Sequence, residues 1–223
     1  MLVGMWMTRN VVTVSPGTFI SDAAVEMSHR GIRRLPVVES SPEELVGIVS
    51  AGDVARAFPP DLNPSAVVAG ERQLCQPVSA IMTRRVRTAT PSTPIEQAAR
   101  VLRDHKIGAM PVLRDSRLVG IITESDILQA FIETTGIGER GVRITFDLSD
   151  DEDVVIGIIE IARRHGVRIA SIMSMLHDGK RLGVARLQGP DSERVIEDIW
   201  KSGHRIISVE GRPPKSVGRP VIE

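Results

Sequence analysis

The sequence is poor in the residues that carry several common functions. Its 223 residues include no Tyr, one Cys and only 3% aromatic residues. The single Cys75 cannot form a disulfide within the chain, which favours a reducing, cytoplasmic setting. With 28 basic and 28 acidic residues the net charge is zero, so the composition gives no support for a nucleic-acid-binding surface. No apolar run reaches the roughly 18–20 residues of a membrane span, and the N-terminus lacks the basic region of a signal peptide.

Motifs for catalysis and metal binding are also missing. No Gly-x-Ser-x-Gly, Walker loop or His-Glu-x-x-His occurs. The five histidines show no metal-ligand spacing: His29, His105, His165, His177 and His204. The acidic run from Asp147 to Asp153 could hold a divalent cation, but a solvated helix N-terminus, where acidic residues are favoured, explains it better. We therefore expect no metal site, no required cofactor and no enzymatic activity.

What the sequence does contain is an internal repeat. Residues 7–20 return as residues 82–95, and Gly47–Val54 returns as Gly120–Ile127. The offset is 75 residues at first and 73 at the end, because the second copy has a loop that is two residues shorter. Two copies are too few for a solenoid, so the repeat predicts two similar units packed face to face, with related sites at the seam.

Each copy of the repeat predicts the element order β–α–β–β–α. Apolar residues at helical spacing begin at Ile20 in the first copy, whose helix Gly31 ends, and at Ile95 in the second. Before Ile95, Thr93 is the expected N-cap and Pro94 the first helical residue. The last helix of each copy is expected to begin at Ser50 or Thr123. Short strands are predicted at 11–14, 35–38, 45–49, 86–89 and 118–122, and a linking helix at 64–75.

The chain after residue 140 predicts a different unit. Strands are indicated at 142–148, 167–176, 180–187 and 204–209, and amphipathic helices at 152–165 and 191–202. Asp178-Gly179 is a hairpin signal between the two central strands. The resulting order, β–α–β–β–α–β, is the ferredoxin-like pattern.

The motif Gly-x-x-[Ser/Thr]-x-x-Asp closes both copies, as Gly47 to Asp53 and as Gly120 to Asp126, and a Met-Thr pair opens both. With these motifs, residues 7–58 and 79–135 resemble a tandem pair of cystathionine-β-synthase (CBS) domains, the Bateman module. Residues 141–211 are similar to an ACT domain, and the order CBS–CBS–ACT resembles acetoin-utilisation-type regulatory proteins of bacteria.

The resemblance implies an α/β (α+β) fold, in which two CBS repeats form a pseudo-twofold pair beside a ferredoxin-like, ACT-like domain. Residues 59–78 would be a linker and 212–223 a flexible tail. The ACT family usually has a Gly where its first strand meets its first helix, and Leu148–Asp153 has none. This departure favours a packing or dimerisation role for the third domain over amino-acid binding.

Ser50 and Thr123 stand where a strand is predicted to meet a helix. Free N–H groups and a hydroxyl at such a helix start can face a ligand. Asp53 or Asp126, three residues later, could accept hydrogen bonds from both hydroxyls of a ribose. The alternative is that [Ser/Thr]-x-x-Asp is only a helix-capping arrangement. The repeat and the resemblance favour the ligand interpretation.

In the CBS family the Asp of one repeat works with the helix-to-strand corner of the other, which implies two unequal sites. Site one would join Thr8, Ile32, Arg33, Arg34, Thr123 and Asp126. Site two would join Ser50, Asp53, Thr83, Ile107, Gly108, Ala109 and Met110.

Only site one is expected to carry guanidinium groups suited to phosphate, because we align Arg33 and Arg34 with Ala109 and Met110. Site one should therefore rank ATP or ADP above adenosine. The alternative is that both arginines are solvated surface residues.

The resemblance implies a non-enzymatic, cytoplasmic sensor that binds an adenine nucleotide (AMP, ADP, ATP or a related adenosyl ligand) between its CBS repeats. It would form at least a homodimer and act on an unknown protein target, without nucleic acid or membrane. The alternative is a protein-interaction or dimerisation module whose clefts are vestigial and empty.

Overall fold

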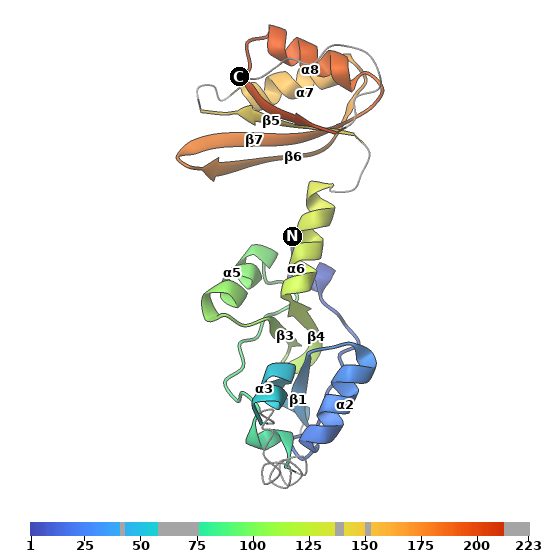
Figure 1. Cartoon of the computed structure of the whole chain (residues 1–223), viewed down its shortest axis with the longest axis vertical. Coiled ribbons are helices and arrows are strands. Elements are labelled where there is room, and N and C mark those ends of the chain that lie inside the picture. Colours follow the sequence, from blue (N-terminus) through green and yellow to red (C-terminus); the bar gives the residue numbers. More distant parts are fainter. Residues whose placement is uncertain (41–42, 58–75, 137–140, 150–152, 212–223) are drawn as a thin grey trace, which may run out of the picture. The chain divides into compact units, whose positions relative to one another are not determined.

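The computed structural model describes residues 1–40, 43–57, 76–136, 141–149 and 153–211. The chain divides into two compact units, Met1–Ala130 and Phe131–Glu223, which are described separately (Figure 1). The predicted linking helix at 64–75 and the predicted tail at 212–223 lie outside the described residues. In the described part of the chain, no helix is both long and apolar enough to cross a membrane.

The first unit contains the two repeats, each built around one antiparallel hairpin. The elements of the first repeat are α1 (Val3–Trp6), α2 (Ile20–Arg30), β1 (Arg34–Ser40), β2 (Glu43–Ser50) and α3 (Ala51–Ala57). Those of the second are η1 (Val78–Ala80), α5 (Ile95–His105), β3 (Ala109–Arg114), β4 (Arg117–Thr123) and α6 (Glu124–Thr135), the last of which runs on into the second unit. The prediction of a mixed α and β fold with two CBS-like repeats is confirmed.

The local geometry confirms one detail of the predicted helices and corrects another. Gly31 ends α2 in the left-handed region, with φ of 64°, where a side chain would be strained. The predicted cap of α5 is wrong, because its N-cap is Pro94 and no side chain caps the helix. The hydroxyl of Thr93 instead accepts a hydrogen bond from the amide of Thr90 at 2.9 Å, so it closes the preceding turn.

The strand register corrects our alignment of the two repeats at the helix-to-strand corner. Arg34 pairs with Ser50 in the first hairpin, and Ala109 pairs with Thr123 in the second. Arg34 therefore corresponds to Ala109, and Arg33 to Gly108, one residue earlier than we aligned them. Met110 corresponds to Leu35, and both side chains are buried in the cores of their repeats.

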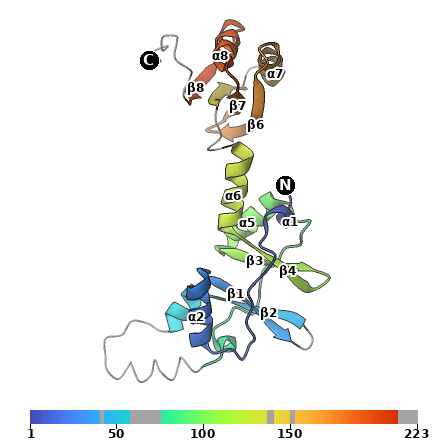
Figure 2. The same cartoon turned by 90° about the vertical axis from the view of Figure 1, so that its right-hand side faces the viewer.

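The repeats exchange their N-terminal segments. Val3 and Met7, at the start of the first repeat, are buried in the core of the second, whereas Val78 and Met82, at the start of the second, are buried in the core of the first. Thr8 exchanges backbone hydrogen bonds of 3.0 and 2.9 Å with Ile121 of β4. In Figure 2 the dark-blue N-terminal segment runs past β4 before it reaches α2. The exchange ties the two hairpins into one unit.

Gly47 and Gly120 make this exchange possible. A methyl group at position 120 would lie 2.6 Å from the sulfur of Met7 and 3.0 Å from the carbonyl oxygen of Thr8, and Gly47 is crowded in the same way by Met82. A glycine at the end of a strand can let the backbone approach a ligand closely. The structure shows that it admits a methionine side chain and the neighbouring backbone instead.

The second unit has the ferredoxin-like topology that the sequence predicts. Its elements are β5 (Val142–Asp147), α7 (Val154–Arg164), β6 (Arg168–His177), β7 (Lys180–Gln188), α8 (Ser192–Lys201) and β8 (Ile206–Glu210). The antiparallel sheet has the order β6-β7-β5-β8, and α7 and α8 cover one of its faces (Figure 1). The side-chain hydrogen bond of 2.9 Å between His165 and Asp198 joins the ends of the two helices and lowers the pKa of Asp198 below its ordinary value of 3.8.

Candidate functional site

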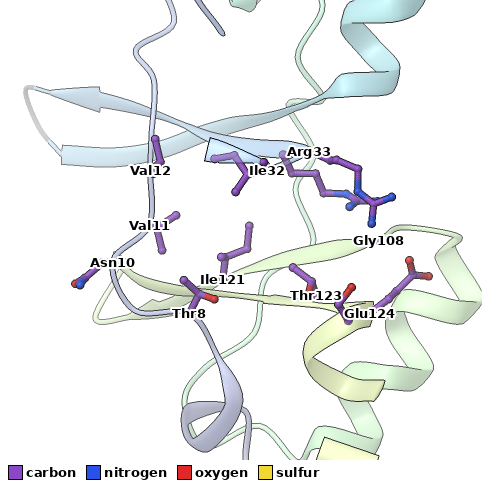
Figure 3. Close-up of a pocket in the computed structure, with 13 residues that line it drawn as sticks. Thr8, Asn10, Val11, Val12, Ile32, Arg33, Gly108, Ile121, Thr123 and Glu124 are labelled. Carbon is purple, nitrogen blue, oxygen red and sulfur yellow. The ribbon is translucent and has the colours of Figure 1, made fainter. Parts of the chain in front are cut away.

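A cleft of about 230 Å³ lies between the two repeats of the first unit. The corner after α2 forms one side, and the end of β4 with the start of α6 forms the other (Figure 3). The segment that follows Thr8 closes the cleft between them. The lining residues are Thr8, Asn10, Val11, Val12, Gly31, Ile32, Arg33, Arg34, Gly108, Ile121, Thr123, Glu124 and Ser125.

The structure brings five of the six residues predicted for site one together in this cleft. Thr8, Ile32, Arg33, Arg34 and Thr123 all line it. Thr8 is fixed there by its backbone pairing with Ile121, two residues before Thr123. Thr8 and Thr123 are 115 positions apart in the sequence (123 − 8), and they lie together because the exchanged N-terminal segment carries Thr8 onto the second hairpin.

The sixth residue, Asp126, lies one turn into α6 and is partly buried. Its Oδ2 accepts hydrogen bonds from the amide and the hydroxyl of Thr123, at 2.8 and 2.7 Å. The amide of Asp126 donates to the hydroxyl of Thr123 at 3.2 Å. One carboxylate oxygen is therefore used for helix capping, as the alternative interpretation expected. The other, Oδ1, makes no hydrogen bond within the described residues.

The first repeat contains the same cap. Oδ2 of Asp53 accepts from the amide and hydroxyl of Ser50, at 2.8 and 2.6 Å. Here Oδ1 is also engaged, because it accepts a hydrogen bond from Arg56. Thr83 pairs with Ile48 through two backbone hydrogen bonds and so lies on the hairpin that carries Ser50. The two repeats are thus alike in their caps and differ in the freedom of the second carboxylate oxygen.

The other residues predicted for site two divide between different places. Met110 and Ala109 are buried, with 1% and 5% of their surface exposed, so their side chains pack in the protein interior. Ile107 packs against the core of the second repeat. Gly108 lines the first cleft, where the guanidinium of Arg34 lies against it. The side chain of Met110 thus lies in the core of its repeat, and a contact between this residue and a ligand stays a prediction.

The first cleft separates apolar and charged groups. Val11, Val12, Ile32 and Ile121 give it aliphatic walls, while Arg33, Glu124 and Thr123 lie toward the helix start (Figure 3). In the described parts of the chain, no group of three or more acidic, His or Cys residues is placed to hold a metal ion. The arrangement suits an organic ligand with an apolar ring and an anionic group.

Sequence reasoning missed seven lining residues: Asn10, Val11, Val12, Gly31, Ile121, Glu124 and Ser125. Asn10, Val11 and Val12 come shortly after Thr8, and the last two fall in the strand predicted at 11–14, where the structure has only an isolated bridge at Val14. Ile121, Glu124 and Ser125 lie inside the motif that identified Thr123 and Asp126. Testing every residue of the motif, rather than its two polar landmarks, would have found them.

The first unit matches a known family. A family model described as "CBS domain" matches residues 3–60 and 78–133, just over half of the chain. The chain is 35% identical over 129 residues to the uncharacterized protein MJ1225 of Methanocaldococcus jannaschii, covering 56% of this chain and 45% of that protein. It is 38% identical over 122 residues to a homoserine O-acetyltransferase of Methanococcoides burtonii, covering 54% of this chain and 22% of that one. The chain thus spans less than half of the length of these relatives.

Two solved structures are similar to the same part of the chain. One is a putative acetoin utilization protein (AcuB) from Vibrio cholerae, with a TM-score of 0.51 and 30% identity over 59% of this chain and 90% of that one. The other is CBSX2 in complex with AMP, with a TM-score of 0.50 and 30% identity over 59% of this chain and 96% of that one.

Proposed function

Because this chain belongs to the CBS-domain family, we propose that it is a regulatory protein that binds an adenine nucleotide in the cleft between its two repeats. The observation that carries the proposal is the meeting of aliphatic walls, two arginines and Thr123 in one cleft, with Asp126 hydrogen-bonded to Thr123 one turn into α6. The complex of the related CBSX2 with AMP supports the ligand class. Residues 7–58 and 79–135 would be the two CBS repeats.

The cleft offers a partner for each part of the ligand. The adenine ring packs between aliphatic side chains such as Val12 and Ile121, where it leaves water. Oδ1 of Asp126 accepts hydrogen bonds from the ribose hydroxyls, and Oδ2 keeps the cap. Arg33 and Arg34 bind phosphate through charge-assisted hydrogen bonds. The volume is somewhat below the roughly 300 Å³ at which small-molecule sites begin, so we expect side chains at its mouth to move on binding.

Ligand binding between two repeats can regulate because it couples affinity to their relative arrangement. A nucleotide that contacts Arg34 of one repeat and Thr123 of the other stabilises only arrangements that keep both contacts. The third domain, which we propose is ACT-like, would relay this state to a protein target. The protein would then be a sensor without enzymatic activity or a required cofactor.

Isothermal titration calorimetry with adenosine, AMP, ADP, ATP and S-adenosylmethionine tests the proposal. At least one of these ligands should bind with release of heat and raise the melting temperature of the protein. If none binds at millimolar concentration, the alternative of an interaction module with empty clefts is favoured. A pull-down of protein partners would then be the informative measurement.

Replacing Arg33 and Arg34 together by Ala should remove most of the preference for nucleotide over adenosine. Exposed charges are screened by solvent, so we expect AMP to bind about three- to tenfold more weakly and adenosine to be little affected. The ratio of the two dissociation constants, measured by calorimetry, is the readout. A variant with the same ratio as the parent would show that the arginines are solvated surface residues.

We also propose a dimer, with α6 in the interface. Leu128 and Phe131 lie three residues apart on this helix and are 59% and 53% exposed. Light scattering should give a mass near a multiple of the 24.3 kDa chain. Replacing Leu128 by Glu should lower that mass, because a charge in an apolar interface is costly. A monomeric parent protein at micromolar concentration would contradict the proposal.

A further inference from the structure

Glu124 places a carboxylate beside the arginines of the cleft. It is the first residue of α6, and its amide donates a hydrogen bond of 3.3 Å to the carbonyl of Gly108. A methyl group at position 108 would lie 1.8 Å from Nη2 of Arg34 and 3.0 Å from Oε2 of Glu124. The guanidinium and the carboxylate are therefore within about 5 Å of each other, across the bare backbone of Gly108.

Both charges remain available to a ligand. In the part of the chain that the structure describes, neither Arg34 nor Glu124 takes part in an ion pair or a side-chain hydrogen bond. Both residues line the cleft, and in Figure 3 Arg33 and Glu124 lie at the same end of it, on opposite sides. An anion bound by the arginines would meet the Glu124 carboxylate as its nearest negative neighbour.

This combination is peculiar to the first cleft. In the other repeat, Ala51 follows Ser50 where Glu124 follows Thr123, and Ala109 corresponds to Arg34. The backbone is otherwise the same, since the amide of Ala51 donates to the carbonyl of Arg33 at 2.9 Å, as Glu124 does to Gly108. The charge of Glu124 is thus an addition to a backbone arrangement that both repeats share.

We propose that Glu124 limits the number of phosphates that the cleft accepts and selects a nucleoside monophosphate over the triphosphate. This inference rests on the proposed function. One phosphate can be bound by Arg33 and Arg34 together, and their two positive charges outweigh one carboxylate. Each further phosphate adds negative charge at the end of the cleft where Glu124 lies, and repulsion between like charges in a partly solvated site is enough for a several-fold loss of affinity.

The test compares Glu124→Gln with the parent protein by calorimetry, with AMP and ATP titrated in the absence of divalent cations. We expect the parent to bind AMP more tightly than ATP. In the variant, the ratio of the ATP and AMP dissociation constants should fall about three- to tenfold, mainly because ATP binds more tightly. Glu39→Gln is the matched control, because it removes the same charge from an exposed residue of β1 that does not line the cleft. Its ratio of affinities should equal that of the parent.

Salt provides a second readout. The difference between parent and Glu124→Gln should shrink when the ionic strength is raised toward about 0.5 M, because screening weakens repulsion between exposed charges. Nucleotide binding with the same AMP to ATP ratio in parent and variant would overturn this inference and leave the proposed function standing. Absence of nucleotide binding by the parent would overturn both.

Discussion

Replacing Asp126 by Asn is expected to weaken adenine nucleotide binding at least tenfold while α6 stays capped. Oδ2 of Asp126 accepts two hydrogen bonds from Thr123, and the single oxygen of Asn can take over that role. The amide nitrogen that replaces Oδ1 cannot accept a hydrogen bond from a ribose hydroxyl. Losing a charged acceptor costs about 1.5–3 kcal/mol, which corresponds to a factor of ten or more in affinity.

Calorimetry on the Asn variant measures this loss, and circular dichroism checks that the helix content is kept. Asp126→Ala should bind the nucleotide as weakly as Asp126→Asn does. It should also be less stable than the parent, because the substitution removes the helix cap. Asp53→Asn is the internal comparison, since Arg56 already occupies Oδ1 of Asp53, and we expect a smaller effect. If Asp126→Asn and Asp53→Asn combined leave nucleotide binding unchanged, neither carboxylate binds ribose.

Replacing Gly183 by Ala is expected to destabilise the second unit by about 1–3 kcal/mol, the usual cost of overpacking a core. A Cβ at position 183 would lie 2.3 Å from Cε2 and 2.4 Å from Cζ of Phe146. Phe146 cannot move aside easily, because its side chain is fully buried on β5 among the core residues of the unit. The position therefore requires Gly for space.

Urea denaturation followed by tryptophan fluorescence measures this effect. The chain has two tryptophans, Trp6 in the first unit and Trp200 in the second, so a Trp6→Phe background leaves Trp200 as the reporter. In a Phe146→Leu background the cost of Gly183→Ala should fall, because the ring that it meets is gone. Equal costs in both backgrounds would show that the two positions do not clash.

The internal repeat predicted most helices and strands of the first unit, because such elements depend on residues that are close in the sequence. Helix and strand patterns in both copies depend on residues within one or two turns of each other, such as Gly31 at the end of α2. Errors arose where local rules compete. Thr93 follows the rule for an N-cap but bonds to its own turn, and an alignment made without strand register misplaced Arg33 and Arg34 by one position.

The sequence by itself determined most helices and strands of both units, the ferredoxin-like order of the second and, through family resemblance, the meeting of Thr8, Arg34 and Thr123 in one cleft. The strands predicted at 11–14 and 86–89 are wrong, because only isolated bridges form there, at Val14 and Ala89. Only the tertiary structure decided which segments exchange between the repeats, because that depends on how buried side chains such as Met7 fill a core built from residues 89–122. It also decided that the charged groups of Arg34 and Glu124 lie near each other beside Gly108. These contacts join residues with no local relation in the chain, so no periodicity or motif records them.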